Sequence, residues 1–188
     1  MSRIGILALQ GGFAAHARRL AELGHDPVEV RNAVEFESID GLVLPGGESS
    51  VHLLLIDRFG LDRPLREFAR SGKPVLATCA GLVLAARRVA SPAQPSFGFI
   101  DVDVVRNAYG RQRHSFEARS DNGELPLIFI RAPKVVRTGP AVTVLATFNS
   151  EPVLLRQGNV TAAAFHPELT GETQVHRDAF GPPKRRPI

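Results

Sequence analysis

Three apolar segments, each followed at once by a glycine-bearing turn, constrain the fold of this 188-residue chain more than any other feature. The segments are Arg3–Leu9, Asp40–Leu44 and Val75–Thr78, and the turns are Gln10-Gly11-Gly12, Pro45-Gly46-Gly47 and Cys79-Ala80-Gly81. Short continuous apolar runs are typical of strands buried on both faces of a parallel sheet. Because ligands of such sheets bind beyond the carboxyl ends of the strands, we expect the three turns to face one crevice.

Segments with helical spacing alternate with these strands. Phe13–Leu23 carries an apolar stripe and is followed by Gly24, a residue type that commonly ends helices. The other expected elements of the first half are the helices Val51–Phe59, Pro64–Arg70 and Leu82–Val89 and the short strand Val28–Val30. Because strand, helix, strand order implies parallel pairing, the first half predicts a doubly wound α/β sheet.

The second half changes to strand-like segments, which we expect to add antiparallel strands to this architecture. They are Ile100–Val105, Leu127–Ile130, Val142–Phe148, Val153–Leu155 and Val160–Phe165. No break in composition divides the chain, so residues 1–180 are expected to form one domain. Residues 181–188 contain three Pro and three basic residues, and this composition predicts a disordered tail.

Composition excludes several classes of protein and of site. A chain with one Cys cannot form an internal disulfide, and no spacing of Cys and His resembles a zinc site. The N-terminal apolar run Ile4–Leu9 is too short for a signal peptide or a membrane span. The net charge is +4, and Lys184, Arg185 and Arg186 supply three of these charges. We therefore expect a cytoplasmic protein that binds no metal, membrane or nucleic acid.

Cys79 has the setting of a catalytic nucleophile. It lies between an apolar strand and an expected helix, with the small residues Ala77 and Gly81 two positions to either side, as in a nucleophile elbow. The positive end of the helix would favour the thiolate. A buried structural role is the alternative for a lone cysteine, and the elbow setting disfavours it.

His166 and Glu168 are the expected partners of this thiol. They follow Val160–Phe165, and residues two apart in extended chain point to the same face. His166 would take the thiol proton, while Glu168 would orient the ring and stabilise the imidazolium. A surface His-Pro-Glu turn is the alternative for this tripeptide alone. The other histidines lack a comparable carboxylate partner, and we expect surface or packing roles for His16, His25, His52, His114 and His176.

Two of the turns offer backbone donors for an oxyanion. Adjacent glycines at Gly46 and Gly47 leave N–H groups free to face a ligand, and the amide of Ala80 directly follows the expected nucleophile. An ordinary Pro-Gly-Gly loop is the alternative. These glycines lack the Lys and the spacing of a P-loop, and Gln10-Gly11-Gly12 is no complete dinucleotide motif, so nucleotide binding has little support.

Several motifs together resemble those of class I, triad-type glutamine amidotransferases. They are Pro45-Gly46-Gly47-Glu48-Ser49, Thr78-Cys79-Ala80-Gly81 and Phe165-His166-Pro167-Glu168-Leu169. Further segments are similar to the glutaminase subunits of pyridoxal 5′-phosphate synthases, the PdxT family, and these are Ala8–Gly11, Arg106–Gln112, Phe129–Pro133 and Arg156–Val160. The resemblance runs from about Arg3 to His176, and the fold it implies is a flavodoxin-like, doubly wound mixed sheet in three layers.

The resemblance implies hydrolysis of L-glutamine to L-glutamate and ammonia through a Cys79-His166-Glu168 triad, with the oxyanion held by Gly47 and Ala80. The implied glutamine-binding residues are Gly47, Glu48, Ser49, Arg106, Ile130 and Arg131. Arg106 or Arg131 would pair with the α-carboxylate of the substrate. Proteins of this family pass ammonia to a synthase subunit of the PdxS family within a large hetero-oligomer, where pyridoxal 5′-phosphate is made. The resemblance implies no cofactor for this chain.

The chain departs from the family pattern at several positions, including Ala77, and two alternative functions remain. Ala77 stands where the family usually has Gly, which adds a methyl group to the elbow. The chain could serve another acceptor, such as the imidazole-forming synthase of the histidine pathway, but the segments Arg106–Gln112 and Phe129–Pro133 argue against this. It could also be a non-catalytic interaction module of the same fold. The intact Cys79, His166 and Glu168 argue against that alternative.

Overall fold

The computed structural model describes residues 1–106, 108 and 115–183 of the chain. Its central sheet contains the strands β1 (Arg3–Leu7), β2 (Asp26–Val30), β3 (Gly41–Leu44), β4 (Val75–Thr78), β11 (Thr143–Phe148), β12 (Glu151–Gln157) and β13 (Val160–Ala163). Their order is β11-β12-β13-β4-β3-β1-β2. The strands from β13 to β2 pair in parallel, while β12 pairs antiparallel with both β13 and β11. The sheet is therefore mixed, as expected.

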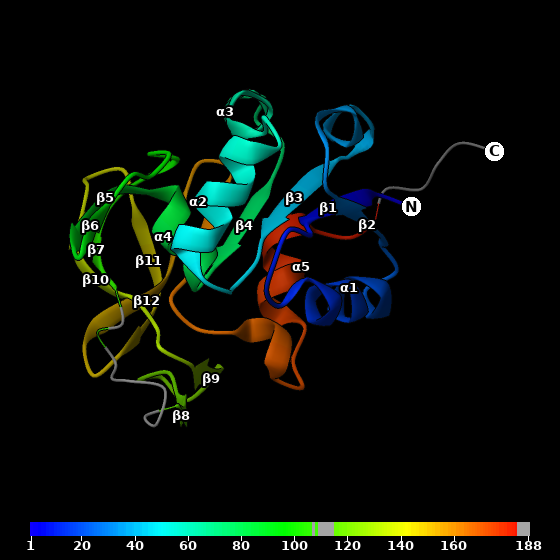
Figure 1. Cartoon of the computed structure of the whole chain (residues 1–188). Coiled ribbons are helices and arrows are strands. Elements are labelled where there is room, and N and C mark those ends of the chain that lie inside the picture. Colours follow the sequence, from blue (N-terminus) through cyan, green and yellow to red (C-terminus); the bar gives the residue numbers. More distant parts are fainter. Residues whose placement is uncertain (107, 109–114, 184–188) are drawn as a thin grey trace.

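Helices cover both faces of the parallel strands. They are α1 (Phe13–Glu22), α2 (Ser49–Arg58), α3 (Asp62–Arg70), α4 (Ala80–Ala85) and α5 (Gln174–Phe180), with short 3₁₀ turns at Ala33–Ser38 and Pro167–Leu169. In Figure 1, α1 and α5 lie on one face of the sheet, and α2 and α4 lie on the other. Apolar side chains such as Leu20 of α1 and Leu65 of α3 are fully buried between the layers. This three-layer arrangement confirms the flavodoxin-like fold class.

The remaining strands form two smaller sheets. A four-stranded sheet has the order β10-β7-β5-β6, and β8 pairs with β9. These strands are β5 (Ala86–Ser91), β6 (Ala93–Gln94), β7 (Ile100–Val105), β8 (Phe116–Arg119), β9 (Pro126–Phe129) and β10 (Lys134–Thr138). Both sheets lie at the end of the molecule opposite β2 (Figure 1). Only part of the second half therefore joins the central sheet, because strand pairing is decided by contacts between segments that are distant in the sequence.

The prediction of a helix over Leu82–Val89 is wrong from Ala86 onward. Helix α4 ends at Ala85, and β5 begins at Ala86 and pairs in parallel with β7. All residues of α4 are buried, so this helix has no polar face that would mark its length in the sequence. The change from helix to strand at Ala86 follows from backbone pairing with β7, and the local sequence pattern does not indicate it.

The predicted tail is described only in its first three residues. The Gly181 carbonyl lies 3.2 Å from Nε2 of His25. Residues 184–188, which carry the basic charges, lie outside the described residues. Disorder of the segment stays a prediction. Among the described helices, none has the length and apolar character needed to cross a membrane.

Candidate active site

The turns that follow β1, β3 and β4 meet at one edge of the central sheet, together with the segment that follows β13. The N–H of Gly12 donates to the Gly46 carbonyl at 3.0 Å. A methyl group at Gly46 would lie 2.4 Å from Cε1 of His166 and 3.4 Å from Cβ of Cys79. Glycine is therefore required at position 46, because the His166 ring packs directly on the backbone there. The three turns therefore meet as expected, although only the turns after β3 and β4 line the pocket beside Cys79.

Cys79 lies on a strained backbone turn between β4 and α4. Its φ and ψ are 49° and −105°, in the left-handed half of the map that residues other than glycine seldom adopt. A methyl group at Gly81 would lie 1.9 Å from the Leu44 carbonyl oxygen, so the first turn of α4 can pass β3 only with glycine there. The sharp turn and the close passage are those of the expected nucleophile elbow.

Ala77 lies in the strand that leads into this elbow. It is fully buried within β4 and lies in register between Leu44 of β3 and Ala162 of β13. The extra methyl group that distinguishes it from glycine therefore belongs to the packed interior of the sheet.

His166 and Glu168 form a tightly bonded, buried pair. Nδ1 of His166 lies 2.7 Å from Oε1 of Glu168, and the two side chains are 10% and 1% exposed. Burial lowers the pKa of His166, but hydrogen bonds to Cys79 and Glu168 outweigh it and raise the pKa to about 10. The ring is therefore a cation at neutral pH, and thiolate nucleophiles are found beside such cations.

Sequence reasoning missed His16, which contacts the carboxylate of this pair. Nε2 of His16 lies 3.4 Å from Oε2 of Glu168 and 3.1 Å from Oγ1 of Thr78. Nδ1 of His16 lies 2.9 Å from Nε2 of His176. The expectation that His16 lacks a carboxylate partner is wrong, because the segment after β13 and α1 are adjacent only in the folded chain. The available signal was its place on the apolar stripe of α1, one turn before Leu20.

Both members of this histidine pair are neutral at pH 7. Burial lowers the pKa of His16 to about 4, although Glu168 acts in the opposite direction. Burial likewise lowers the pKa of His176 to about 3. The other described histidines match their expected packing role, since His25 and His52 are buried against backbone carbonyls. His114 lies outside the described residues.

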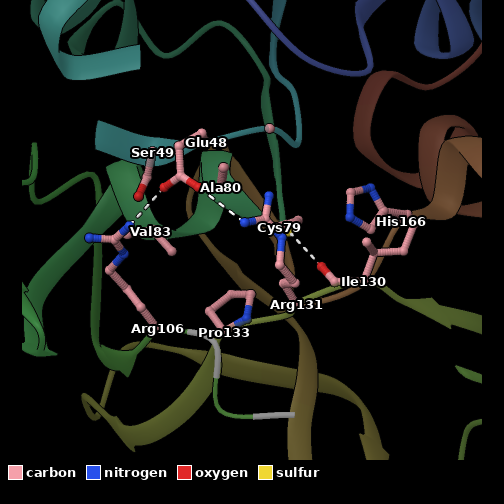
Figure 2. Close-up of a pocket in the computed structure, with 11 residues that line it drawn as sticks. Glu48, Ser49, Cys79, Ala80, Val83, Arg106, Ile130, Arg131, Pro133 and His166 are labelled. Atoms are coloured by element: carbon pink, nitrogen blue, oxygen red, sulfur yellow. Dashed lines mark hydrogen bonds and ion pairs between the residues drawn. The ribbon is translucent and has the colours of Figure 1, made fainter. Parts of the chain in front are cut away.

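A pocket of about 100 Å³ opens beside the Cys79 side chain (Figure 2). Its lining contains the expected triad members Cys79 and His166, the expected oxyanion donors and all the expected glutamine-binding residues, which are Gly47, Glu48, Ser49, Ala80, Arg106, Ile130 and Arg131. Pockets for drug-sized ligands measure about 300–1,000 Å³. The smaller volume here suits a ligand no larger than an amino acid.

The charged groups of the pocket are already paired with one another. Glu48 receives Nη2 of Arg106 at 2.8 Å on one oxygen and Nη1 of Arg131 at 3.3 Å on the other (Figure 2). The Glu48 N–H donates to Oε1 of Gln10 at 2.8 Å, which fixes the turn after β3 to the turn after β1. Two cations and one anion at one end of a small pocket complement a zwitterionic amino acid.

The segment that follows β9 brings two further expected residues into the pocket. The Cys79 thiol faces the Ile130 carbonyl, with Sγ 3.8 Å from the oxygen. The next residue, Arg131, has a φ of 47°, a strained value for a residue with a side chain. Of the motif Arg106–Gln112, the structure describes Arg106 and Ala108, and the rest of this motif lies outside the described residues. No cluster of three potential metal ligands occurs in the described part of the chain.

Known proteins with similar sequences cover nearly the whole chain. The pyridoxal 5′-phosphate synthase subunit PdxT of Shouchella clausii is 47% identical over 179 residues, which cover 93% of this chain and 92% of that protein. The protein of the same name from Frankia casuarinae is 51% identical over 182 residues, with 93% and 92% covered. The resemblance to the PdxT family that the motifs indicated is therefore confirmed.

Solved structures agree with this relationship. A crystal structure of a glutamine amidotransferase superposes with a TM-score of 0.86 at 40% identity, covering 94% of this chain and 96% of that one. A structure of PurLQS from Thermotoga maritima reaches a TM-score of 0.66 at 16% identity over 95% of this chain and 98% of its own, and shares the fold. Residues 6–180 match the SNO glutamine amidotransferase family. This match confirms the expectation that the chain is a glutamine-hydrolysing enzyme. The chain belongs to the SNO glutamine amidotransferase family.

Proposed function

We propose that this chain is the glutaminase subunit of a pyridoxal 5′-phosphate synthase and that Cys79, His166 and Glu168 are its catalytic triad. The observation that carries the proposal is the placement of a Cys79 elbow and a bonded His166–Glu168 pair on one small pocket. The relatives named PdxT, which are 46–51% identical, support the synthase context.

The first half of the reaction transfers the glutamine acyl group to sulfur. The Cys79 thiolate attacks the side-chain amide carbon, a C–S bond forms, and the carbonyl electron pair moves onto oxygen. The N–H groups of Gly47 and Ala80, which both line the pocket, are the proposed donors to this oxyanion. The His166 imidazolium then gives its proton to the amide nitrogen, the C–N bond breaks, and ammonia leaves.

The second half regenerates the enzyme. Neutral His166 takes a proton from a water molecule, whose oxygen attacks the thioester carbon. The C–S bond breaks, glutamate is released, and the Cys79 thiolate again lies beside an imidazolium. Glu168 holds Nδ1 of the ring at 2.7 Å throughout, which leaves Nε2 to face the sulfur and the leaving nitrogen.

The charged end of the pocket is proposed to recognise the amino-acid part of glutamine. The α-carboxylate would bind Arg106 or Arg131, and the α-ammonium group would bind Glu48. Because Glu48 now pairs with both arginines, glutamine binding exchanges one of these internal ion pairs for contacts with the substrate. Ser49 and the Ile130 carbonyl complete the lining around the substrate side chain.

The proposed partner is a synthase subunit of the PdxS family, in a large hetero-oligomer that receives the ammonia without release into water. Channelling is chemically necessary because free ammonia becomes protonated at neutral pH and loses its nucleophilic electron pair. The proposed location is the reducing cytoplasm, which would keep the lone Cys79 in its thiol or thiolate form. The chain is proposed to need neither a metal nor a cofactor.

The test is nitrogen transfer in a mixture with the matching synthase subunit. We expect the wild-type chain to support pyridoxal 5′-phosphate formation from glutamine, whereas Cys79→Ala supports it only when ammonium salt replaces glutamine. Rescue by ammonium shows that the synthase is intact and that the defect lies in ammonia supply. Glutamine-dependent product formation by the Cys79→Ala mixture at the wild-type rate would contradict the proposal.

A further inference from the structure

The two oxygens of the Glu168 carboxylate have unequal surroundings. Oε1 is bonded to Nδ1 of His166, whereas Oε2 is buried and makes no hydrogen bond within the described part of the chain. The contact that Oε2 does have is Nε2 of His16 at 3.4 Å, and both side chains are at most 1% exposed. A buried carboxylate oxygen without a donor is strongly destabilised, so this contact decides how the carboxylate is held.

The protonation of the histidine pair follows from the neighbouring atoms. If the proton of His16 is on Nε2, it is donated to Oγ1 of Thr78 and lies beside Oε2 of Glu168, and Nδ1 accepts from the Nε2–H of His176. In the opposite tautomer, the His16 lone pair would face the carboxylate. The Nδ1–H of His176 would also be a buried donor, and no acceptor is bonded to that atom among the described residues. The first arrangement avoids both penalties: His176 donates to His16, and the Nε2–H of His16 is donated to Thr78 and lies beside Oε2 of Glu168.

We propose that His16 is a positioning residue for the catalytic carboxylate: its Nε2–H holds Oε2 of Glu168 so that Oε1 stays aimed at Nδ1 of His166. This inference rests on the proposed triad but adds a member to it. His16 touches neither the pocket nor the sulfur, and it acts on the reaction only through Glu168. His176 in turn fixes the tautomer of His16.

The proposed role has an electrostatic consequence besides the geometric one. Burial raises the pKa of Glu168, but opposing interactions, among them the hydrogen bond and charge of His166, outweigh burial and keep the pKa below its ordinary value. The groups that face His16 are Glu168, Thr78, His176 and, farther along, the charged His166. Without the His16 donor, the carboxyl group is driven toward its neutral form, which cannot stabilise the His166 imidazolium.

Two amide variants of His16 distinguish the effect of its Nε2–H donor from the effect of its side-chain volume. In His16→Gln the amide nitrogen reaches the position of Nε2, and in His16→Asn it reaches only that of Nδ1. We expect His16→Gln to retain kcat within a few-fold and His16→Asn to lower kcat about tenfold to a hundredfold, with little change in KM, because the donor beside the charged carboxylate is lost. His25→Gln is the matched control, since His25 is buried equally deeply and lies outside the triad.

A second readout does not depend on glutamine turnover. The rate of Cys79 alkylation by iodoacetamide, followed against pH, reports the thiolate that His166 stabilises. We expect His16→Asn to lower the alkylation rate at neutral pH and so to change this profile, and His16→Gln to keep the wild-type profile. Superposable profiles for wild type and His16→Asn, or equal losses in the Gln and Asn variants, would overturn the inference. If glutamine hydrolysis itself fails in the wild type, the alkylation profiles still decide the role of His16.

Discussion

Replacing His176 with Gln isolates the contribution of one buried neutral histidine to acid sensitivity. In the folded protein, burial lowers the pKa of His176 to about 3, against an ordinary value of 6.5. Between pH 7 and pH 5 the unfolded chain therefore binds a proton that the folded chain refuses. Stability must fall as the pH falls through this window. The Gln amide can still donate to Nδ1 of His16 but has no proton to take up.

The size of this loss of stability depends almost entirely on the protonation of His176 in the unfolded chain. At pH 5 an imidazole with a pKa of 6.5 is almost fully protonated, whereas the folded group is not, and this difference amounts to about 2 kcal/mol relative to pH 7. His16 adds a similar loss in both proteins, because its pKa is also low. His166 acts in the opposite direction: its raised pKa gives stability that is fully present below pH 6.5 and is lost toward about pH 10.

The assay is urea unfolding at pH 7 and pH 5, followed by circular dichroism. We expect the free energy of unfolding of His176→Gln to fall by about 2 kcal/mol less than that of wild type between the two pH values. Gln174→Ala, an exposed change in the same helix, serves as the control and should show the wild-type pH dependence. The reasoning is refuted if His176→Gln loses as much stability as wild type over this interval.

Two changes in the turn after β3 test the geometry of the site. Gly46→Ala places a methyl group 2.4 Å from Cε1 of His166 and should lower kcat about 100-fold, because the ring must move. Gly171→Ala, whose methyl group meets nothing within 4 Å, should leave kcat unchanged, and equal rates for the two variants would speak against the packing argument. Glu48→Gln should raise the KM for glutamine about tenfold or more through loss of the charge proposed to bind the α-ammonium, and an unchanged KM would reject that role.

The sequence predicted the parallel half of the fold because its signals are local. A short apolar run that ends in glycine marks a strand and its carboxyl end, and such ends necessarily meet at one edge of a sheet. This logic was sufficient to place Cys79, Gly46 and the turn at Gly11 together. The pairing of His166 with Glu168 was also predicted, but the stated reason was wrong, because Glu168 lies in the 3₁₀ turn Pro167–Leu169 and not in extended chain.

The parts that escaped prediction depend on contacts between distant segments. The change from helix to strand at Ala86 is imposed by pairing with β7, and the residues of α4 give no sign of where the helix ends. The contact of His16 with Glu168 joins α1 to the turn after β13, which no local pattern links. The ion pairs of Glu48 with Arg106 and Arg131 likewise arise only after three separate loops have folded together.

The most direct test of the proposed chemistry is glutamate release from glutamine by wild type and Cys79→Ala, each with the matching synthase subunit present. We predict equal amounts of glutamate and ammonia from the wild type and a rate at least about 10⁴-fold lower from Cys79→Ala, as expected for the loss of a covalent nucleophile. Matching circular dichroism spectra would show that the variant is folded. Glutamate release by folded Cys79→Ala at a rate close to that of wild type would contradict the assignment of Cys79 as the nucleophile.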